Sequence, residues 1–349
     1  MLTELQLRNF RCFESLGVEL APDFNFFIGR NGQGKTSILE AACVLLRLQS
    51  QRSATLAPII RFGQKSFAVS GRDKNHALEF RYSPLRRKIS LDQVEQRPLD
   101  EYLRIARVVS FANTDIELVR GSSEPRRRYL DFLAIQIDPV YRPTLRAYER
   151  ALRSRNALLK SPHPRSRELA AYDPQLLEHG AKLGTMRARL VERIAPLAAA
   201  AHREISGTGE TLLLRFTPGN EADFAGALAD SRTEELRLRQ TIVGPHRDDI
   251  ELLVEAKVAG QYASEGQQRT VALALKIAQA RIFLAEEETP PLLLIDDIFG
   301  ELDPVRRNAL LEHLPAEAQK FVTATTMQWR EDGCEGPVWE LRDRELIRR

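Results

Sequence analysis

The chain has 349 residues, a formal net charge of +3, 43% hydrophobic residues and 28% charged residues. This is an ordinary globular composition, and the length predicts about two domains rather than one small module. The 3 cysteines stand singly, so we expect no disulfide framework, and we find neither a signal peptide nor an apolar run of about 18 residues that would cross a membrane. The slight positive charge permits nucleic-acid binding without requiring it.

The first predicted elements are strands. Apolar and polar residues alternate over residues 2–20, which predicts two strands around a turn at residues 9–12. The apolar and aromatic run at residues 24–28 predicts a buried strand, and residues 37–46 have the pattern of a helix. A glycine-rich stretch at residues 29–36 joins this strand to this helix.

The glycine-rich stretch fits G-x-x-x-x-G-K-[ST], the pattern of a loop that binds nucleotide phosphates. Its glycines let the backbone turn tightly and bring N–H groups close to a phosphate, and the next helix adds its positive dipole end. The alternative is a glycine-rich turn without function, but a flanking strand and helix are the context that the motif requires. The residues predicted to bind ATP are Gly29, Arg30, Asn31, Gly32, Gln33, Gly34, Lys35, Thr36 and Ser37.

The next part of the chain predicts short strands. Alternating or apolar runs occur at residues 66–70, 77–82, 87–91 and 107–111. We interpret them as a small meander that returns to the main sheet.

From residue 120 the pattern changes to helices. Apolar residues recur every three or four positions over residues 126–137, 142–159 and 174–205, and residues 161–165 predict a loop. Residues 120–168 contain 12 Lys/Arg against 5 Asp/Glu. This predicts a helical insertion of roughly a hundred residues. Its basic side is either a solvated helix face or a DNA-binding surface, and the sequence leaves both open.

A polar motif around His246 follows a predicted strand at residues 211–216 and a predicted helix at residues 221–238. His246 fits a buried neutral histidine, and the adjacent acids Asp248 and Asp249 fit an internal ion network. The spacing does not favour a metal site.

A second anion-binding end is predicted at Ser264, where a helix over residues 270–285 follows. Ser264 and Gln267 fit a capping box, in which serine accepts a hydrogen bond from the start of the helix. Gly266 and the exposed N–H groups at this end are also suited to binding a phosphate, and the two roles are compatible.

Two carboxylates end a continuous apolar run at residues 292–295, which predicts a strand covered on both faces. Successive side chains on a strand point in opposite directions, so Asp296 and Asp297 should have different roles. Asp296 would hold Mg²⁺ with Thr36, directly or through water, and Asp297 would orient or deprotonate the attacking water. A solvated or capping pair is the alternative. Another buried strand is predicted at residues 320–326, with threonines that would sense the γ-phosphate.

These motifs resemble the ABC-type ATPase heads of the SMC group, and more narrowly the RecF family of DNA replication and repair proteins. The similarity covers nearly the whole chain. It rests on motifs that stand in the family's order at residues 7–11, 121–131, 244–249, 264–269, 296–303 and 323–325.

The resemblance implies an α/β P-loop NTPase fold of the ABC-type ATPase head, a mixed sheet with flanking helices, and an inserted α-helical arm lobe. Residues 1–119 would form the N-terminal part of the head lobe, with the Walker A motif. Residues 120–239 would form the arm, and residues 240–349 would form the C-terminal part of the head lobe, with the signature and Walker B motifs.

The resemblance also assigns roles to residues. Lys35 and Asp297 would be catalytic, while Thr36 and Asp296 would be the metal ligands. Arg11 would approach the nucleotide. Four further residues would act across a head-to-tail dimer: Ser264, Gly266 and Gln267 as the signature that meets the partner protomer's γ-phosphate, and Asp303 in the cross-dimer loop.

As partners, the resemblance implies duplex DNA, single/double-strand junctions and a second copy of the chain bound in an ATP-dependent way. It implies slow, DNA-stimulated ATP hydrolysis with ATP and Mg²⁺. It further implies work with RecR, together with RecO, to load RecA at gaps, in the cytoplasm and away from membranes.

Three positions depart from the family's pattern. Glu265 stands where the family has glutamine, and Gly300 stands where it has serine. Residues 111–115 lack the usual Pro-Glu-Asp, so no glutamine-loop residue is assigned. Two other functions stay open: a head that binds ATP as a structural element with little hydrolysis, and a transporter ATPase, which the basic insertion and the absent Leu-Ser-Gly-Gly-Gln motif disfavour.

Overall fold

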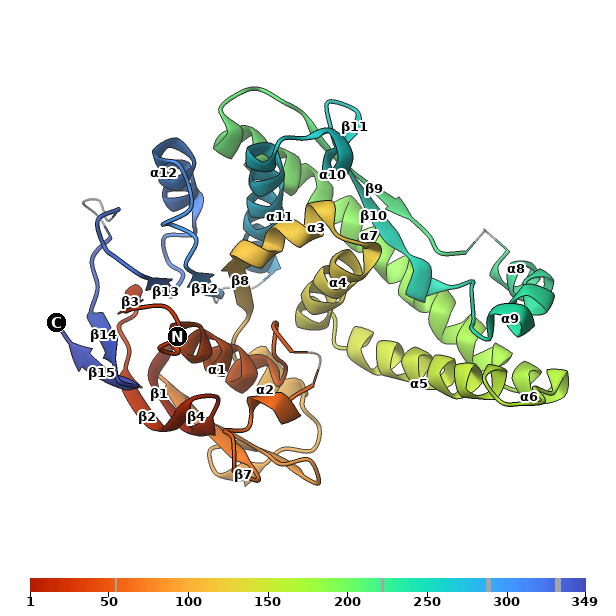
Figure 1. The fold of residues 1–349 in the computed structure, drawn as a ribbon, viewed down its shortest axis with the longest axis horizontal. Helices are drawn as coiled ribbons and strands as arrows, with labels where there is room; N and C mark the ends of the chain where they lie inside the picture. The colour runs from red at the N-terminus through yellow and green to blue at the C-terminus, as the bar shows by residue number, and fades with distance from the viewer. Residues whose placement is uncertain (54, 221–222, 287–289, 330–333) are drawn as a thin grey trace. The chain divides into compact units, whose positions relative to one another are not determined.

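The computed structural model describes residues 1–53, 55–220, 223–286, 290–329 and 334–349 (Figure 1). The chain forms two compact units. The first contains Met1–Thr114 and Gln279–Arg349, and the second contains Asp115–Ala278. Both ends of the chain therefore belong to one unit, and the middle of the chain forms the other.

An antiparallel sheet of the first unit has the strand order β2-β1-β4-β5-β6-β7. Polar and apolar residues alternate along β1, so its apolar side chains are buried while most of the others face solvent. Asn9 near the end of β1 and Arg11 in the turn before β2 both have positive φ. The strands are β1 (Leu2–Phe10), β2 (Phe13–Glu19), β4 (Phe67–Asp73), β5 (Ala77–Tyr82), β6 (Arg87–Leu91) and β7 (Val94–Glu95).

The other sheet of the first unit has the order β15-β14-β3-β13-β12-β8. All neighbours are parallel except β14 and β15. The strands β3, β12 and β13 are buried along most of their length, as expected for a sheet covered on both faces. Its strands are β3 (Phe24–Ile28), β8 (Val108–Ala112), β12 (Leu292–Asp296), β13 (Lys320–Ala324), β14 (Val338–Arg342) and β15 (Glu345–Arg348).

Helix α1 (Lys35–Arg47) contacts strands of both sheets, including β1, β4 and β5 of one and β8, β12 and β13 of the other. All of its residues except Thr36 are buried. A helix that is buried on every side must be apolar nearly all round, and the run Ala41–Leu46 meets this need. The loop before α1 is therefore fixed by the strand β3 at one end and by a core helix at the other.

The remaining helices of the first unit are η1 (Ala57–Ile59), α2 (Asp100–Arg104) and α12 (Pro304–His313). The segment η2 (Asn113–Ile116) lies where the chain passes from the first unit to the second, and α11 (Glu265–Glu286) leads back.

The second unit combines helices with the antiparallel sheet β11-β10-β9. The longest helix, α7, packs against α5 and β9. The sheet consists of β9 (Leu212–Thr217), β10 (Asp249–Val254) and β11 (Lys257–Val258). The helices are α3 (Glu117–Arg120), α4 (Ser123–Ile137), α5 (Tyr141–Leu159), α6 (Ser166–Ala170), α7 (Asp173–Ser206), α8 (Phe224–Asp230), α9 (Arg232–Leu238), η3 (Pro245–Arg247) and α10 (Ala259–Tyr262).

The structure confirms the predicted strands of the meander and the three long helices of the insertion, with ends shifted by a few residues. The single helix predicted at residues 221–238 is instead α8 and α9, separated at Ser231, and its first two residues lie outside the described ranges. Strands β14 and β15 were not predicted. Residues 240–278 group with the second unit because β10 pairs with β9 along its whole length. The three-part division into lobes stays a prediction.

Candidate functional site

The glycine-rich loop has the backbone conformation that glycine permits. Gly29, Gly32 and Gly34 have φ values of 151°, 80° and 108°. A Cβ atom on Gly34 would lie 2.6 Å from Cys12 Sγ, and one on Gly29 would lie 2.8 Å from the carbonyl oxygen of Leu341. At Gly29 and Gly34, both the positive φ and the lack of room for a Cβ atom therefore favour glycine. The loop ends where α1 begins, so unpaired N–H groups and the helix dipole face the same region.

Lys35 lies along this loop. Its Nζ donates hydrogen bonds to the carbonyl oxygens of Gly29, at 2.6 Å, and of Arg30, at 3.2 Å. Burial lowers the pKa of Lys35, and the neighbouring carboxylates of Asp297 and Asp296 oppose that effect. The ammonium group is therefore held next to the two acids that the sequence analysis placed in the same site.

Three side-chain oxygens converge at the ends of α1, β12 and β13. The Thr36 and Thr323 hydroxyls both donate to Oδ1 of Asp296, at 2.8 Å and 2.7 Å. Thr36 and Asp296 are 260 positions apart in sequence, and the parallel sheet brings the ends of their elements together. Carboxylate and hydroxyl oxygens are the ligands that Mg²⁺ prefers, so these residues fit the predicted metal site.

Asp297 follows the last residue of β12 and lines the same cavity as Asp296, so the alternation expected of two successive strand residues does not apply to this pair. The φ of 54° at Asp297 is left-handed, and its backbone N–H donates to the Thr323 hydroxyl at 2.9 Å. Its carbonyl oxygen accepts a hydrogen bond from Asn113 Nδ2 at 3.2 Å. Burial raises the pKa of the Asp297 carboxyl, the charge of Lys35 opposes this, and Asp296 and Glu301 raise it further.

A cavity of about 730 Å³ opens in front of this loop. Arg11 lies on its wall but is already paired: its guanidinium makes hydrogen bonds of 2.8 Å and 2.7 Å to the Glu40 carboxylate. The hydrogen bond with Glu40 raises the pKa of Arg11. The lining residues are Arg11, Cys12, Asn31, Gly32, Gly34, Lys35, Thr36, Ser37, Arg52, Pro58, Ile60, Phe62, Asp296 and Asp297.

Several lining residues were not predicted from the sequence. Arg52, Ile60 and Phe62 come from the segment between α1 and β4, which has no periodic pattern. Phe62 is 100% exposed, although aromatic side chains are usually buried. The sequence signal that could have identified Phe62 is an aromatic residue in the loop that follows the helix after the glycine-rich motif. Asn113 was also missed, although it lies within the stretch where no glutamine-loop residue could be assigned.

The signature segment, residues 264–269, belongs to the second unit. The predicted capping box is present: the Gln267 N–H donates to Ser264 Oγ at 3.3 Å, and the Ser264 N–H donates to Gln267 Oε1 at 2.8 Å. Glu265 forms an ion pair with Arg269 at 2.9 Å, one turn further along α11. The negative charge of Glu265 is thus paired within α11.

Asp303 begins α12. Its carboxylate accepts a hydrogen bond from the Arg306 N–H at 3.0 Å, which lowers the pKa of Asp303. Gly300 has open space around its Cα, so a serine there would fit. Asp303 is thus an N-cap in this chain, and its predicted role in a cross-dimer loop stays a prediction.

The acids of the motif around His246 form the internal ion network that was predicted for them. Asp248 pairs with Arg187 at 2.9 Å, and Asp249 pairs with Arg126 at 2.6 Å. His246 lies within hydrogen-bond distance of the Tyr148 hydroxyl, at 2.7 Å, and burial lowers its pKa to about 4. Among the described residues, no group of three or more His, Cys, Asp or Glu side chains could hold a metal ion.

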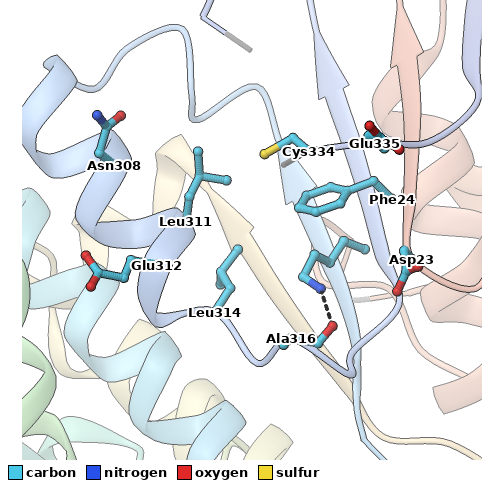
Figure 2. Close-up of a pocket in the computed structure, with 10 residues that line it drawn as sticks. Asp23, Phe24, Asn308, Leu311, Glu312, Leu314, Ala316, Cys334 and Glu335 are labelled. Atoms are coloured by element: carbon cyan, nitrogen blue, oxygen red, sulfur yellow. Dashed lines mark hydrogen bonds between the residues drawn. The ribbon is translucent and has the colours of Figure 1, made fainter. Parts of the chain in front are cut away.

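A second hollow, of about 530 Å³, lies in the first unit near the C-terminal end of α12 (Figure 2). Leu311 and Leu314 form part of its wall, and Phe24 lies opposite (Figure 2). Lys320 at its base donates hydrogen bonds to the carbonyl oxygens of Ala316 and Ala318, at 3.0 Å and 2.7 Å. None of the predicted site residues lines this hollow.

The loop, the acid pair and the parallel sheet define a P-loop ATPase of the ABC-type head class. The family model for the AAA ATPase domain matches residues 1–132. The chain is 35% identical over 365 residues to the DNA replication and repair protein RecF of Bacillus cereus (strain G9842), covering 99% of this chain and 96% of that protein. The chain belongs to the RecF family.

Solved structures agree with this assignment. The recombination mediator protein RecF-ATPrS in the RecFOR pathway matches with a TM-score of 0.89 and 28% identity, covering 100% of this chain and 98% of that one. The Smc head domain from Pyrococcus furiosus bound to the C-terminal domain of ScpA matches with a TM-score of 0.56 and 16% identity, which shows a shared fold alone. In the described part of the chain, no helix has the length and apolar character needed to cross a membrane.

Proposed function

We propose that this protein is an ATP-dependent DNA-binding protein of recombinational repair and replication. ATP binding drives head-to-tail dimerisation on duplex or junction DNA, and slow hydrolysis releases the dimer. The observation that carries the proposal is the convergence of Thr36, Asp296 and Thr323 beside the glycine-rich loop, in a chain of the RecF family.

In this proposal the loop binds the phosphates of ATP. Backbone N–H groups at the start of α1 and the Lys35 ammonium contact the outer phosphates. To do so, Lys35 exchanges its hydrogen bonds to the carbonyl oxygens of Gly29 and Arg30 for contacts with phosphate oxygens. Thr36 and Asp296 would hold Mg²⁺. When bound, the ion would neutralise negative charge on the phosphates. The residues present fit both ATP and Mg²⁺. The hydroxyl and carboxylate oxygens suit the metal ion, and the N-terminus of α1, which has no side-chain cap, suits the phosphates at the same cavity.

Hydrolysis requires a base for the attacking water. Asp297 is suited to this role because burial raises the pKa of its carboxyl, so that the carboxylate accepts a proton more readily. The water forms the new bond to the γ-phosphorus, the bond to the β–γ bridging oxygen breaks, and Asp297 takes the proton. Asn113 and Thr323 hold the Asp297 backbone in place during this step.

The proposal extends to partners. Ser264, Gly266 and Gln267 contact the γ-phosphate held by Lys35 of a second copy, and Asp303 lies in the loop that crosses between the copies. The dimer binds duplex DNA or single/double-strand junctions in the cytoplasm and works with RecR, and with RecO, to support RecA loading at gaps. The family membership and the mediator described for the solved RecF support this assignment.

A direct test measures steady-state ATPase activity and light scattering with and without duplex DNA. We expect wild-type protein to dimerise with ATP and to hydrolyse it slowly. Lys35→Met should abolish ATP-dependent dimers, because it removes the charge on the outer phosphates. Asp297→Asn should dimerise but lose turnover by about 100-fold, the size expected for removing a general base.

Two results would contradict the proposal. Dimers of Lys35→Met that form with ATP would exclude Lys35 as the phosphate ligand. Wild-type turnover no higher than that of Asp297→Asn, with and without DNA, would indicate a head that binds ATP without using its hydrolysis. A DNA-binding assay on gapped, duplex and single-stranded substrates then identifies the preferred structure.

A further inference from the structure

The signature residue Gln267 makes a contact that its motif does not explain. Its Oε1 accepts a hydrogen bond from the Ser264 N–H, and its Nε2 donates to Glu210 Oε1 at 2.7 Å. Glu210 is 57 positions away, in the segment that joins α7 to β9. Both ends of the Gln267 amide are therefore bound, one within the capping box and one to a carboxylate from another element.

The residue that follows Glu210 is bound to the end of the sheet. This residue, Thr211, donates from both its N–H and its hydroxyl to Glu255 Oε1, at 2.7 Å and 2.9 Å. The Glu255 N–H donates back to the Thr211 carbonyl oxygen at 3.1 Å. The paired strands β9 and β10 continue directly from these two residues. The carboxylate that binds Gln267 thus belongs to the residue next to a backbone position that is hydrogen-bonded at the end of the sheet.

The contact determines which way round the Gln267 amide lies. A carboxylate accepts hydrogen bonds only, so it binds the NH₂ group of the amide and directs the carbonyl oxygen toward Ser264. With the amide in this orientation, the capping box closes and Ser264 is held at the start of α11. A hydrogen bond to a charged acceptor is stronger than a neutral one, which favours this single orientation.

We propose that Glu210 is a positioning residue for the signature segment. It orients the Gln267 amide so that Ser264 and the first N–H groups of α11 are arranged for the γ-phosphate of a second copy before that copy arrives. This inference rests on the proposed function, since it concerns the same composite site. Beyond the proposed function, the inference states that the arrangement of the signature residues depends on the segment between α7 and β9.

The test compares wild-type protein with Glu210→Ala, Glu210→Gln and a matched control, Glu251→Ala, which removes a carboxylate from the neighbouring strand β10. Three measurements are made on the full chain. They are amide hydrogen exchange of residues 264–268 without nucleotide, the dimer dissociation constant with ATP, and the affinity of the monomer for a fluorescent ATP analogue.

For Glu210→Ala we expect about tenfold faster exchange in the signature segment and about tenfold weaker ATP-dependent dimers, as loss of one charge-assisted hydrogen bond predicts. ATP binding by the monomer should not change, because Glu210 is not in the loop that holds the phosphates. Glu210→Gln should fall between wild type and Glu210→Ala, because its amide oxygen accepts the same hydrogen bond without the charge that strengthens it. Glu251→Ala should match wild type.

Two outcomes overturn the inference. One is Glu210→Ala behaving like Glu251→Ala in both exchange and dimerisation. The other is Glu210→Gln weakening the dimer as much as Glu210→Ala, which would assign the effect to charge and not to orientation. Failure of the wild-type protein to dimerise with ATP would count against the proposed function, and the exchange measurement on the monomer would still decide the role of Glu210.

Discussion

Phe62 is a fully exposed aromatic residue on the wall of the nucleotide cavity, beside Ile60 and Pro58. An aromatic ring left in water at such a place is suited to stack on a nucleobase, a contact worth about 1–3 kcal/mol per base in other proteins. We therefore expect Phe62→Ala to weaken ATP binding by roughly fivefold to tenfold, at the lower end of that range, with little change in folding stability.

Equilibrium titration with a fluorescent ATP analogue measures this effect. Leu85→Ala is the matched control, since Leu85 is 99% exposed in the same unit but does not line the cavity. Equal affinities for Phe62→Ala and Leu85→Ala would exclude a base contact at Phe62.

Individual residues differ in how far the sequence could predict them. Lys35, Thr36 and Asp296 were assigned correctly to one cavity because the motif and the end of a buried strand are local patterns that fix which edge of the sheet they share. Phe62 and Glu210 were missed because their importance depends on distant parts of the chain. The Glu210 contact joins positions 57 residues apart, and no local pattern encodes that pairing.

At the scale of elements, the half-buried histidine of η3 predicts a sensitivity to acid. Burial lowers the pKa of His246 to about 4 in the folded chain, whereas an unfolded histidine has a pKa of about 6.5. Because the unfolded chain binds the proton more readily, folding stability is complete above pH 6.5 or so and falls as the pH drops toward 4. The expected loss from this group is about 2 kcal/mol at about pH 5.

Urea unfolding at about pH 7.5 and about pH 5 tests this linkage. His246→Asn cannot gain the charge, so its stability should change less between the two conditions than that of wild type. Part of the acid loss will remain, because burial also lowers the pKa of His202. His163→Asn, at an exposed position, should keep the full wild-type loss. An unchanged difference in His246→Asn would contradict the assignment.

Elements with a strong period were predicted well, and short ones were not. The helices α4, α5 and α7 were found because apolar residues recur on one face over many turns. Strands β14 and β15 were missed because charged residues interrupt them, as in the run Trp339–Arg349, and because the pairing of β14 with the distant strand β3 is not visible locally. The pairing of β9 with β10 in the second unit was not predicted for the same reason, since these two strands are far apart in sequence.

At the scale of the whole molecule, DNA binding needs a basic surface. Arg146, Arg150 and Arg153 are exposed on α5 at spacings of four and three, so they share one face of the helix. If this face contacts DNA phosphates, replacing all three by glutamine should weaken binding to duplex DNA and reduce the slope of log affinity against log salt by about 3.

Fluorescence anisotropy over a range of salt concentrations measures both effects. The control replaces three exposed arginines of the first unit, Arg86, Arg87 and Arg97, with glutamine, which changes the net charge by the same amount. Equal salt slopes for the two triple variants would show that general charge, and not the α5 face, accounts for the binding.

A site formed by two copies of the chain leads to a prediction that a site within one chain does not. Lys35 belongs to the first unit and Ser264 to the second, and in the proposed dimer each site takes Lys35 from one copy and Ser264 from the other. Lys35→Met and Ser264→Arg should each be inactive alone. In a mixed dimer, the Ser264→Arg copy supplies an intact loop, the Lys35→Met copy supplies an intact signature, and together they form one complete site.

Mixing the two variants in equal amounts should therefore restore ATPase activity, to at most about a quarter of the wild-type rate, because half of randomly formed dimers are mixed and each has one of two sites. The restored rate should rise with total protein concentration, since dimers must form before turnover. A mixture of Lys35→Met with Asp297→Asn is the control, because both substitutions affect the same half of the site and no dimer of these two copies contains a complete one. Restoration in the first mixture alone would show that the two halves of the site come from different copies. No restoration in either mixture, under conditions where mixed dimers are detected, would contradict the composite site.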